Sequence, residues 1–130
     1  RELPKLLAES DYLSIHVPLT PQTKHMIDRN AFAQMKTTAF LINVARGEIV
    51  DQAALLDALQ NRRIQGAGLD TVADEPLSPD HPLLNKPNVL LTPHIAGGTR
   101  GTSRRRGQAA ADNIFRLASG EQPLHLANPR

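Results

Sequence analysis

Three side chains that can bind or transfer charge follow predicted strands of this sequence: Arg46, Glu75 and His94. Arginine offers a planar fork of donors that suits a carboxylate or phosphate. Histidine exchanges a proton near neutral pH, and a neighbouring carboxylate can orient and tune its imidazole. Because the carboxyl ends of parallel strands meet at one edge of a sheet, we expect the three side chains to converge there.

Each of these residues also has an ordinary interpretation when it is considered alone. An arginine at a strand end is commonly a surface charge, and Glu75 in a polar loop is by default a solvated carboxylate. His94 after Pro93 could equally be satisfied by a backbone carbonyl. The hypothesis of a shared site therefore rests on the three residues as a set.

The elements around Arg46 are predicted most clearly. The apolar run Ala39–Val44 is typical of a buried strand, and Arg46-Gly47 ends it in a tight turn. A helix is predicted from Asp51 to Asn61, with Asp51 as its N-cap and with Val50 and Leu55 as a hydrophobic staple. Arg46 should therefore lie in the turn between a strand and a helix.

Strands and helices alternate along the rest of the chain. The patterns predict strands at 12–17, 64–71 and 89–92, and helices at 2–10, after the N-cap Asp28, and at 102–119 before Gly120. A long polar loop covers 74–87, and the tail from Pro123 is extended. This alternation favours the α/β class, with a partial doubly wound parallel sheet.

Composition excludes several classes of function. The 130 residues have 15 basic and 13 acidic side chains, so the net charge of +2 predicts neither a nucleic-acid nor a membrane partner. The chain has no cysteine, which excludes disulfides and thiol catalysis and fits the cytoplasm. His16, His25, His81 and His125 show no ligand spacing, so we predict no metal site.

Two further patterns are tempting but favour structural interpretations. Gly66-Ala67-Gly68 begins like a dinucleotide fingerprint but leads into a strand, so its glycines are predicted to allow close backbone packing. Arg104-Arg105-Arg106 occupies one turn of a helix without interleaved aromatic residues. A solvated helix face or a subunit contact is the interpretation that we prefer there.

The order and flanks of the three residues resemble a known family. Asn43-Val44-Ala45-Arg46-Gly47, Gly68-Leu69-Asp70, Asp74-Glu75-Pro76-Leu77 and Thr92-Pro93-His94-Ile95-Ala96-Gly97 are similar to motifs of the D-isomer-specific 2-hydroxyacid dehydrogenases. His16-Val17-Pro18-Leu19-Thr20 also fits that family. The resemblance implies a Rossmann-like NAD-binding domain and hydride transfer between NAD or NADP and a 2-hydroxy or 2-oxo acid.

The resemblance also implies roles for individual residues. Arg46 would bind the substrate carboxylate, His94 would act as the acid and base, and Glu75 would orient and tune His94. The cofactor-binding residues would be Val17, Pro18, Val44, Ala45, Arg46, Asp70, His94 and Gly97. Packing at strand ends is the alternative for Val17, Pro18, Val44 and Ala45.

The resemblance sets expectations for domains and partners as well. We expect residues 1–122 to be the second half of a dinucleotide-binding domain, and 123–130 to lead toward a separate substrate domain. The phosphate loop and the residue that selects NAD or NADP would lie before Arg1, so the isolated chain is expected to be inactive. The full protein is expected to be a cytoplasmic homodimer. Alternatives are a protein like the C-terminal-binding-protein corepressors, which share this fold, and an inactive fragment.

Overall fold

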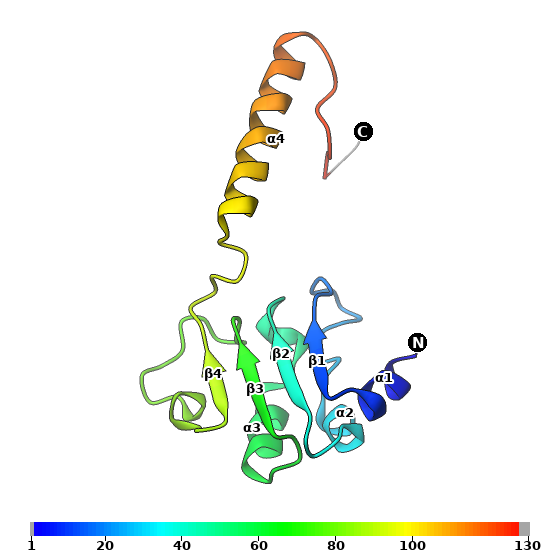
Figure 1. The fold of residues 1–130 in the computed structure, drawn as a ribbon, viewed down its shortest axis with the longest axis vertical. Coiled ribbons are helices and arrows are strands. Elements are labelled where there is room, and N and C mark those ends of the chain that lie inside the picture. The colour runs from blue at the N-terminus through cyan, green and yellow to red at the C-terminus, as the bar shows by residue number, and fades with distance from the viewer. Residues whose placement is uncertain (1, 128–130) are drawn as a thin grey trace. The chain divides into compact units, whose positions relative to one another are not determined.

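The computed structural model describes residues 2–127, in which helices alternate with parallel strands (Figure 1). Residues up to Ile95 form one compact unit, and those from Ala96 onward form a second. The first unit contains α1 (Leu3–Glu9), β1 (Tyr12–Ile15), α2 (Arg29–Gln34), β2 (Phe40–Asn43), the 3₁₀ turn η1 (Gly47–Ile49), α3 (Gln52–Gln60), β3 (Gly66–Leu69), the 3₁₀ turn η2 (Pro82–Asn85) and β4 (Val89–Leu91). The second unit contains α4 (Arg100–Ala118).

The four strands form one parallel sheet in the order β1-β2-β3-β4. In this register Ile15 pairs with Asn43, Asn43 with Leu69, and Leu69 with Leu91. The last residues of the four strands are therefore aligned, and the loops that follow them leave from one edge (Figure 1). The predicted α/β class with a Rossmann-like parallel sheet is confirmed.

One face of the sheet carries the core. Alternate strand residues point to that face, including Leu13, Leu41 and Leu69, which are at most 6% exposed. The helices α2 and α3 pack there through Phe32 and Leu55. The opposite face keeps apolar side chains in solvent, with Tyr12 71% and Leu90 70% exposed. On this outer face Phe40 of β2 stacks on Tyr12 of β1, and both rings are exposed. The strand β2 is therefore buried on one face.

The segment around Arg46 folds largely as predicted. Asp51 caps α3 by accepting hydrogen bonds from the backbone N–H groups of Ala53 and Ala54, at 3.0 and 3.1 Å. The staple residues Val50 and Leu55 are 3% and 2% exposed. The turn η1 was not predicted, since only three residues form it and Arg46 precedes it as its N-cap.

The other predicted elements exist, with shifted ends. β1 stops at Ile15, before Val17, and α4 begins two residues before the predicted Thr102. The long loop after β3 contains η2, which His81 caps by accepting from the backbone N–H of Leu83 at 3.2 Å. Asp28 caps α2 as predicted, through the backbone N–H of Ala31 at 2.8 Å.

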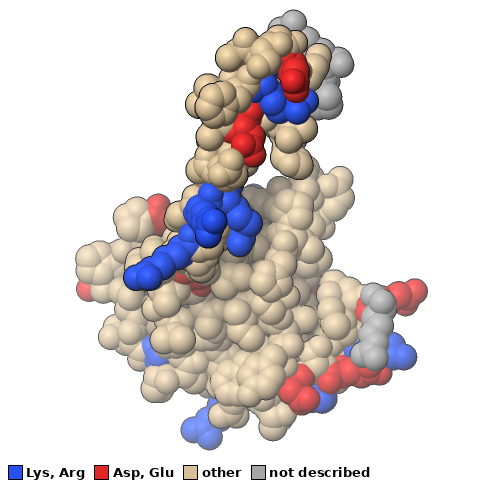
Figure 2. All heavy atoms as spheres, turned by 45° about the horizontal axis from the view of Figure 1, so that its top comes forward, with Lys and Arg blue, Asp and Glu red and all other residues tan. Residues whose placement is uncertain are grey.

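The second unit begins at Ala96 and contains α4 and the chain that follows it. Thr99 caps the helix, and Gly120 follows its end with φ +75, a left-handed conformation that glycine adopts freely. Arg104, Arg105 and Arg106 are exposed, and Figure 2 shows basic side chains gathered on this helix. Among the described residues, no helix is both long and apolar enough to cross a membrane.

Candidate functional site

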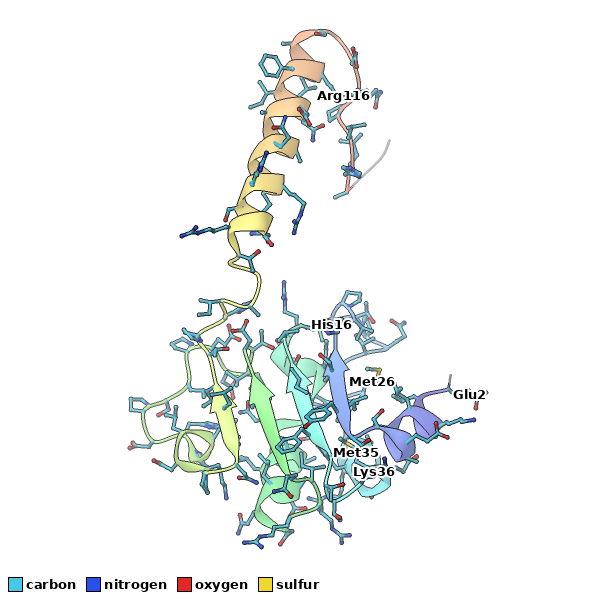
Figure 3. All side chains as sticks on the ribbon, viewed as in Figure 1. Glu2, His16, Met26, Met35, Lys36 and Arg116 are labelled. Atoms are coloured by element: carbon cyan, nitrogen blue, oxygen red, sulfur yellow. The ribbon has the colours of Figure 1, made fainter. Side chains whose placement is uncertain are left out.

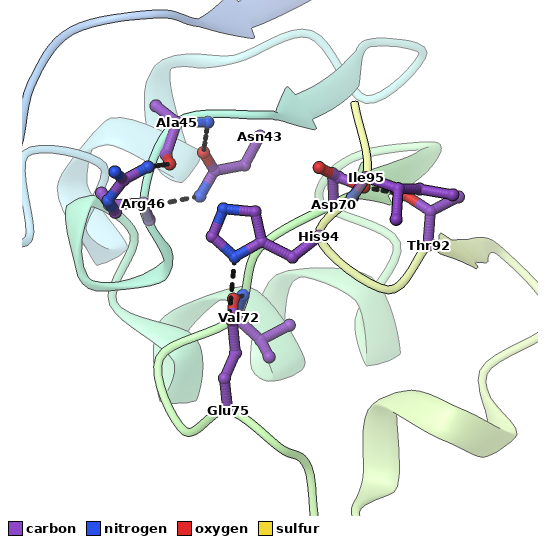
Figure 4. A network of polar contacts seen from close by, with 9 residues as sticks. All are labelled: Asn43, Ala45, Arg46, Asp70, Val72, Glu75, Thr92, His94 and Ile95. Atoms are coloured by element: carbon purple, nitrogen blue, oxygen red, sulfur yellow. Dashed lines mark hydrogen bonds and ion pairs between the residues drawn. The ribbon is translucent and has the colours of Figure 1, made fainter. Parts of the chain in front are cut away.

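His94 and Glu75 form the centre of the candidate site (Figure 4). Nδ1 of His94 lies 2.9 Å from Oε2 of Glu75, while Oε1 of Glu75 accepts from the backbone N–H of Val72 at 3.0 Å. The hydrogen bond from His94, and then the one from Val72, lower the pKa of Glu75. An ionised carboxylate can only accept, so His94 donates through Nδ1–H and its Nε2 is left to exchange a proton.

The pair is accessible from solvent. The side chains of His94 and Glu75 are 48% and 39% exposed, so a small molecule can reach the imidazole. A cavity of about 590 Å³ adjoins the pair. Its walls are mainly apolar and include Leu77, Leu84 and Leu91. Apolar walls strengthen polar interactions at their edge, because they reduce the local screening by water.

Asp70 directly follows β3 and lies next to the turn Thr92–Ile95, which carries His94. It is 6% exposed, and its Oδ1 accepts from the hydroxyl of Thr92 at 2.5 Å and from the backbone N–H of Ile95 at 2.9 Å. A carboxylate is an acceptor for an amide N–H₂ group such as the one on nicotinamide.

Arg46 leaves the same edge of the sheet but does not contact the pair. Its guanidinium is exposed and donates to the carbonyl of Ala45 at 2.6 Å. Within residues 2–127, the structure gives it no hydrogen bond to Glu75 or His94. The structure therefore brings two of the three predicted residues into contact and places the third at the end of the neighbouring strand β2.

The turn that carries Arg46 is organised by Asn43, a residue for which the sequence predicted no role. Asn43 is 1% exposed; its amide donates to the carbonyl of Arg46 at 2.9 Å, and its oxygen accepts from the backbone N–H of Ala45 at 3.1 Å. A polar residue that ends a buried strand needs such partners. That rule could have identified Asn43 from its position alone.

Gly47 brings the Arg46 turn against the Glu75 loop. A Cβ atom on Gly47 would lie 1.9 Å from the carbonyl carbon of Val72 and 2.3 Å from the nitrogen of Ala73. Only glycine permits this approach. The same loop is held to α3, because the backbone N–H of Ala73 donates to Gln52 at 3.1 Å. Gly47 thus makes the loops that follow β2 and β3 neighbours.

The proposed cofactor residues of the first unit lie along the carboxyl edge. Val17 and Pro18 are exposed just after β1, beyond His16, which Figure 3 labels at the end of that strand. Val44 and Ala45 are half-buried after β2. The apolar atoms of these residues suit the flat rings of a nicotinamide dinucleotide, and the Asp70 carboxylate suits its amide group. The residue set therefore fits this cofactor. Gly97 is exposed in the second unit.

The Gly66–Gly68 segment is a strand, as the sequence predicted, and not a phosphate-binding turn. A Cβ atom on Gly66 would lie 2.6 Å from the carbonyl oxygen of Asn88, so this glycine allows β3 to pack closely against the chain before β4. A Cβ atom on Gly68 would make an ordinary van der Waals contact, 3.9 Å from Cγ1 of Ile42. The predicted packing role therefore holds for Gly66 and is not required at Gly68.

A parallel α/β sheet with charged residues in the loops at its carboxyl edge defines a Rossmann-like protein, whose ligands bind at that edge. The chain belongs to the D-isomer specific 2-hydroxyacid dehydrogenases: residues 1–96 match the model of that family's NAD binding domain.

Individual relatives and solved structures agree with this family. The chain is 48% identical over 126 residues to a glyoxylate reductase of Korarchaeum cryptofilum, covering 97% of this chain and 38% of that protein. The NAD complex of a D-isomer specific 2-hydroxyacid dehydrogenase from Lactobacillus delbrueckii ssp. bulgaricus superposes with a TM-score of 0.89 at 37% identity, covering 98% of this chain and 43% of that one. A family member from Xanthobacter autotrophicus Py2, in complex with NADPH and MES, gives 0.84 at 39% identity, with 98% and 52% covered.

The matched relatives are much longer than this chain. It spans 38% to 40% of the length of the curated relatives that it matches.

Proposed function

We propose that the full-length gene product transfers a hydride between NAD or NADP and a 2-hydroxy or 2-oxo acid. The observation that carries this proposal is the hydrogen bond between His94 and Glu75 at the carboxyl edge of the sheet. A histidine paired with a carboxylate is a proton carrier with a fixed orientation. Membership of the dehydrogenase family supplies the hydride chemistry that such a carrier would serve.

His94 is the acid and base in this proposal. Glu75 accepts from Nδ1–H and so directs Nε2 toward the substrate. During oxidation of a 2-hydroxy acid, Nε2 takes the hydroxyl proton and the imidazole becomes a cation beside an anionic carboxylate. During reduction, the same nitrogen returns the proton to the oxygen of the 2-oxo acid. Glu75 holds the imidazole in the same orientation in both directions.

Arg46 binds the substrate carboxylate. Among the described residues, its exposed guanidinium donates to the neighbouring carbonyl of Ala45. A substrate carboxylate could take the place of that carbonyl and form a stronger, bidentate interaction. The buried hydrogen bonds of Asn43 hold the backbone of this turn while the side chain moves. Arg46 would also stabilise negative charge on the reacting oxygen.

The cofactor would lie along the carboxyl edge of the sheet. Val17 and Pro18 would contact its adenine side, Val44 and Ala45 its nicotinamide side, and Asp70 would accept from the carboxamide. Arg46, His94 and Gly97 would complete the cofactor contacts. The nicotinamide, when bound, accepts or supplies the hydride. Similar solved structures hold NAD in one case and NADPH in another, so the proposal includes both cofactors.

The remaining parts of the proposal concern domains and assembly. Residues 1–122 would belong to a dinucleotide-binding domain, and 123–130 would lead from it toward a substrate domain. The protein would act in the cytoplasm as a homodimer. Exposed apolar side chains on the outer sheet face, with Tyr12 and Leu90 at 71% and 70%, support burial against further protein. Size-exclusion chromatography of the full-length gene product tests the dimer.

Glyoxylate is the first substrate to test, because the relative from Korarchaeum cryptofilum is a glyoxylate reductase. The full-length gene product should oxidise NADH or NADPH with glyoxylate, hydroxypyruvate or pyruvate. It should not do so with acetaldehyde, which lacks the carboxylate that Arg46 would bind. Loss of reduced-cofactor absorbance is the measurement. No turnover of any 2-oxo acid would contradict the proposal and favour a corepressor-like or inactive protein.

A further inference from the structure

His94 has a backbone conformation that needs restraint from its surroundings. Its φ is +54, in the left-handed region that only a few per cent of residues other than glycine adopt, asparagine, aspartate and histidine more often than the rest. Its backbone N–H donates to the carbonyl of Thr92 at 3.0 Å, which closes a tight turn around Pro93. Such a conformation persists only where surrounding contacts determine it.

A single carboxylate oxygen supplies those contacts on both sides of the turn. Oδ1 of Asp70 accepts from the hydroxyl of Thr92, two residues before His94, and from the backbone N–H of Ile95, directly after it. The distances are 2.5 and 2.9 Å. The ends of the turn are therefore tied to the same atom, and the imidazole projects from between them toward Glu75 (Figure 4).

The carboxylate that anchors the turn is itself fixed. The backbone N–H of Asp70 donates to the carbonyl of Asn43 at 2.9 Å, which continues the pairing between β2 and β3. The backbone N–H of Thr92 donates to the carbonyl of Leu69 at 3.0 Å, which continues the pairing between β3 and β4. Asp70 is also 6% exposed, so burial limits the movement of its side chain.

We propose that Thr92 is a positioning residue for His94: its hydroxyl, through Asp70, holds the turn in which Nδ1 of His94 meets Glu75. The proposal rests on the proposed function of His94 as the proton carrier. Thr92 itself touches no reacting atom. Its contribution is to keep the imidazole orientation that leaves Nε2 for the substrate, because a loosened turn would let the ring leave Glu75.

The test uses three substitutions of Thr92 and one control in the full-length gene product. Thr92→Val keeps the shape of the side chain and removes the hydroxyl, Thr92→Ala removes the hydroxyl without adding bulk, and Thr92→Ser restores a donor. Thr38→Val is the matched control, since Thr38 is exposed and precedes β2 at the opposite edge of the sheet.

Two readouts are measured on each variant. The first is nitrogen NMR of protein with labelled histidine, which reports whether the neutral ring of His94 carries its proton on Nδ1 or Nε2. The signal of His94 is assigned by its loss in His94→Gln. The second is kcat/KM for glyoxylate across pH. We expect Val and Ala to reduce the Nδ1–H population and to lower kcat/KM about 10- to 100-fold, Ser to recover most of both, and Thr38→Val to change neither.

The outcomes separate this proposal from the function on which it rests. If the wild-type protein has no turnover, the proposed function fails, and the tautomer of His94 alone then decides whether Thr92 positions it. If the wild type is active and Thr92→Val keeps both the Nδ1–H tautomer and kcat/KM, the positioning role is overturned. Loss of activity with an unchanged tautomer would overturn it too.

Discussion

Gly47 lies directly against the backbone of Val72: a Cβ atom at Gly47 would be 1.9 Å from the carbonyl carbon of that residue. This contact joins the turn that carries Arg46 to the loop that carries Glu75. The two loops follow different strands, so their relation depends on the absence of one side chain. The candidate site is therefore assembled by packing as well as by hydrogen bonds.

Replacing Gly47 by alanine should destabilise the protein. The added methyl group would have to displace the backbone at Val72 and Ala73, and overpacking of this kind costs about 1–3 kcal/mol. Urea unfolding measures the change, and Gly68→Ala is the control, because its Cβ would lie 3.9 Å from Ile42. Equal midpoints for the two variants would show that the loops are not in close contact.

Asn43→Ala should also weaken the site through the turn. The substitution removes an acceptor for Ala45 and a donor for Arg46 at a position that is 1% exposed. Leaving such backbone groups without partners costs about 1–3 kcal/mol. Urea unfolding measures this loss, with the exposed Asn30→Ala in α2 as the control. A loss no greater than that of the control would show that Asn43 does not stabilise the Arg46 turn.

Glu75 should titrate below its ordinary pKa of 4.5, because hydrogen bonds from His94 and Val72 favour its carboxylate. Since the pKa is lower in the folded protein, the stability that this group contributes is present above its unfolded pKa. It is lost as the pH falls through the folded pKa. Carbon NMR of labelled glutamate measures the midpoint, and His94→Gln should raise it by removing the larger cause. An unchanged midpoint in that variant would contradict the pairing.

Arg46→Gln should raise the KM for glyoxylate far more than it lowers the affinity for NADH. The substitution removes a charged, bidentate donor, and hydrogen bonds to charged groups contribute about 1.5–3 kcal/mol, or roughly 10- to 100-fold in KM. Steady-state kinetics in the full-length gene product gives both constants. An unaltered KM for glyoxylate would assign the carboxylate to another residue.

Residues 1–130 on their own should not reduce glyoxylate with NADH. Their sequence has no Gly-x-Gly-x-x-Gly pattern, the fingerprint of a turn that binds the cofactor pyrophosphate at a helix N-terminus, and the Gly97-Gly98 turn before α4 lacks this spacing. The full-length gene product, assayed in parallel, is the control. Measurable turnover by the shorter chain would contradict this prediction.

Local patterns predicted most of the fold. Asp28 and Asp51 cap helices where the sequence places them, because an N-cap bond depends on residues only a few positions apart. The ends of strands were predicted less well. The first strand was expected to reach Val17, but it ends at Ile15, where its pairing with β2 ends. The turn η1 was missed because it is too short to produce a periodic pattern.

The candidate site could be predicted only in part. Convergence of strand ends suggested that Glu75 and His94 would meet, and they do, at 2.9 Å. The contacts of Gly47 with Val72 and of Thr92 with Asp70 join residues far apart in the chain, so no local pattern indicates them. The fold of the Arg46 side chain back onto Ala45 was likewise not foreseeable, because it depends on the local backbone.

His94→Gln in the full-length gene product tests whether His94 transfers the substrate proton. In this variant kcat for glyoxylate should fall about 10²- to 10⁴-fold, the usual contribution of a general acid, while NADH binding is retained. His125→Gln is the control, because its backbone has a similar left-handed φ of +57. Activity within a few-fold of the wild type in His94→Gln would show that another group transfers the proton.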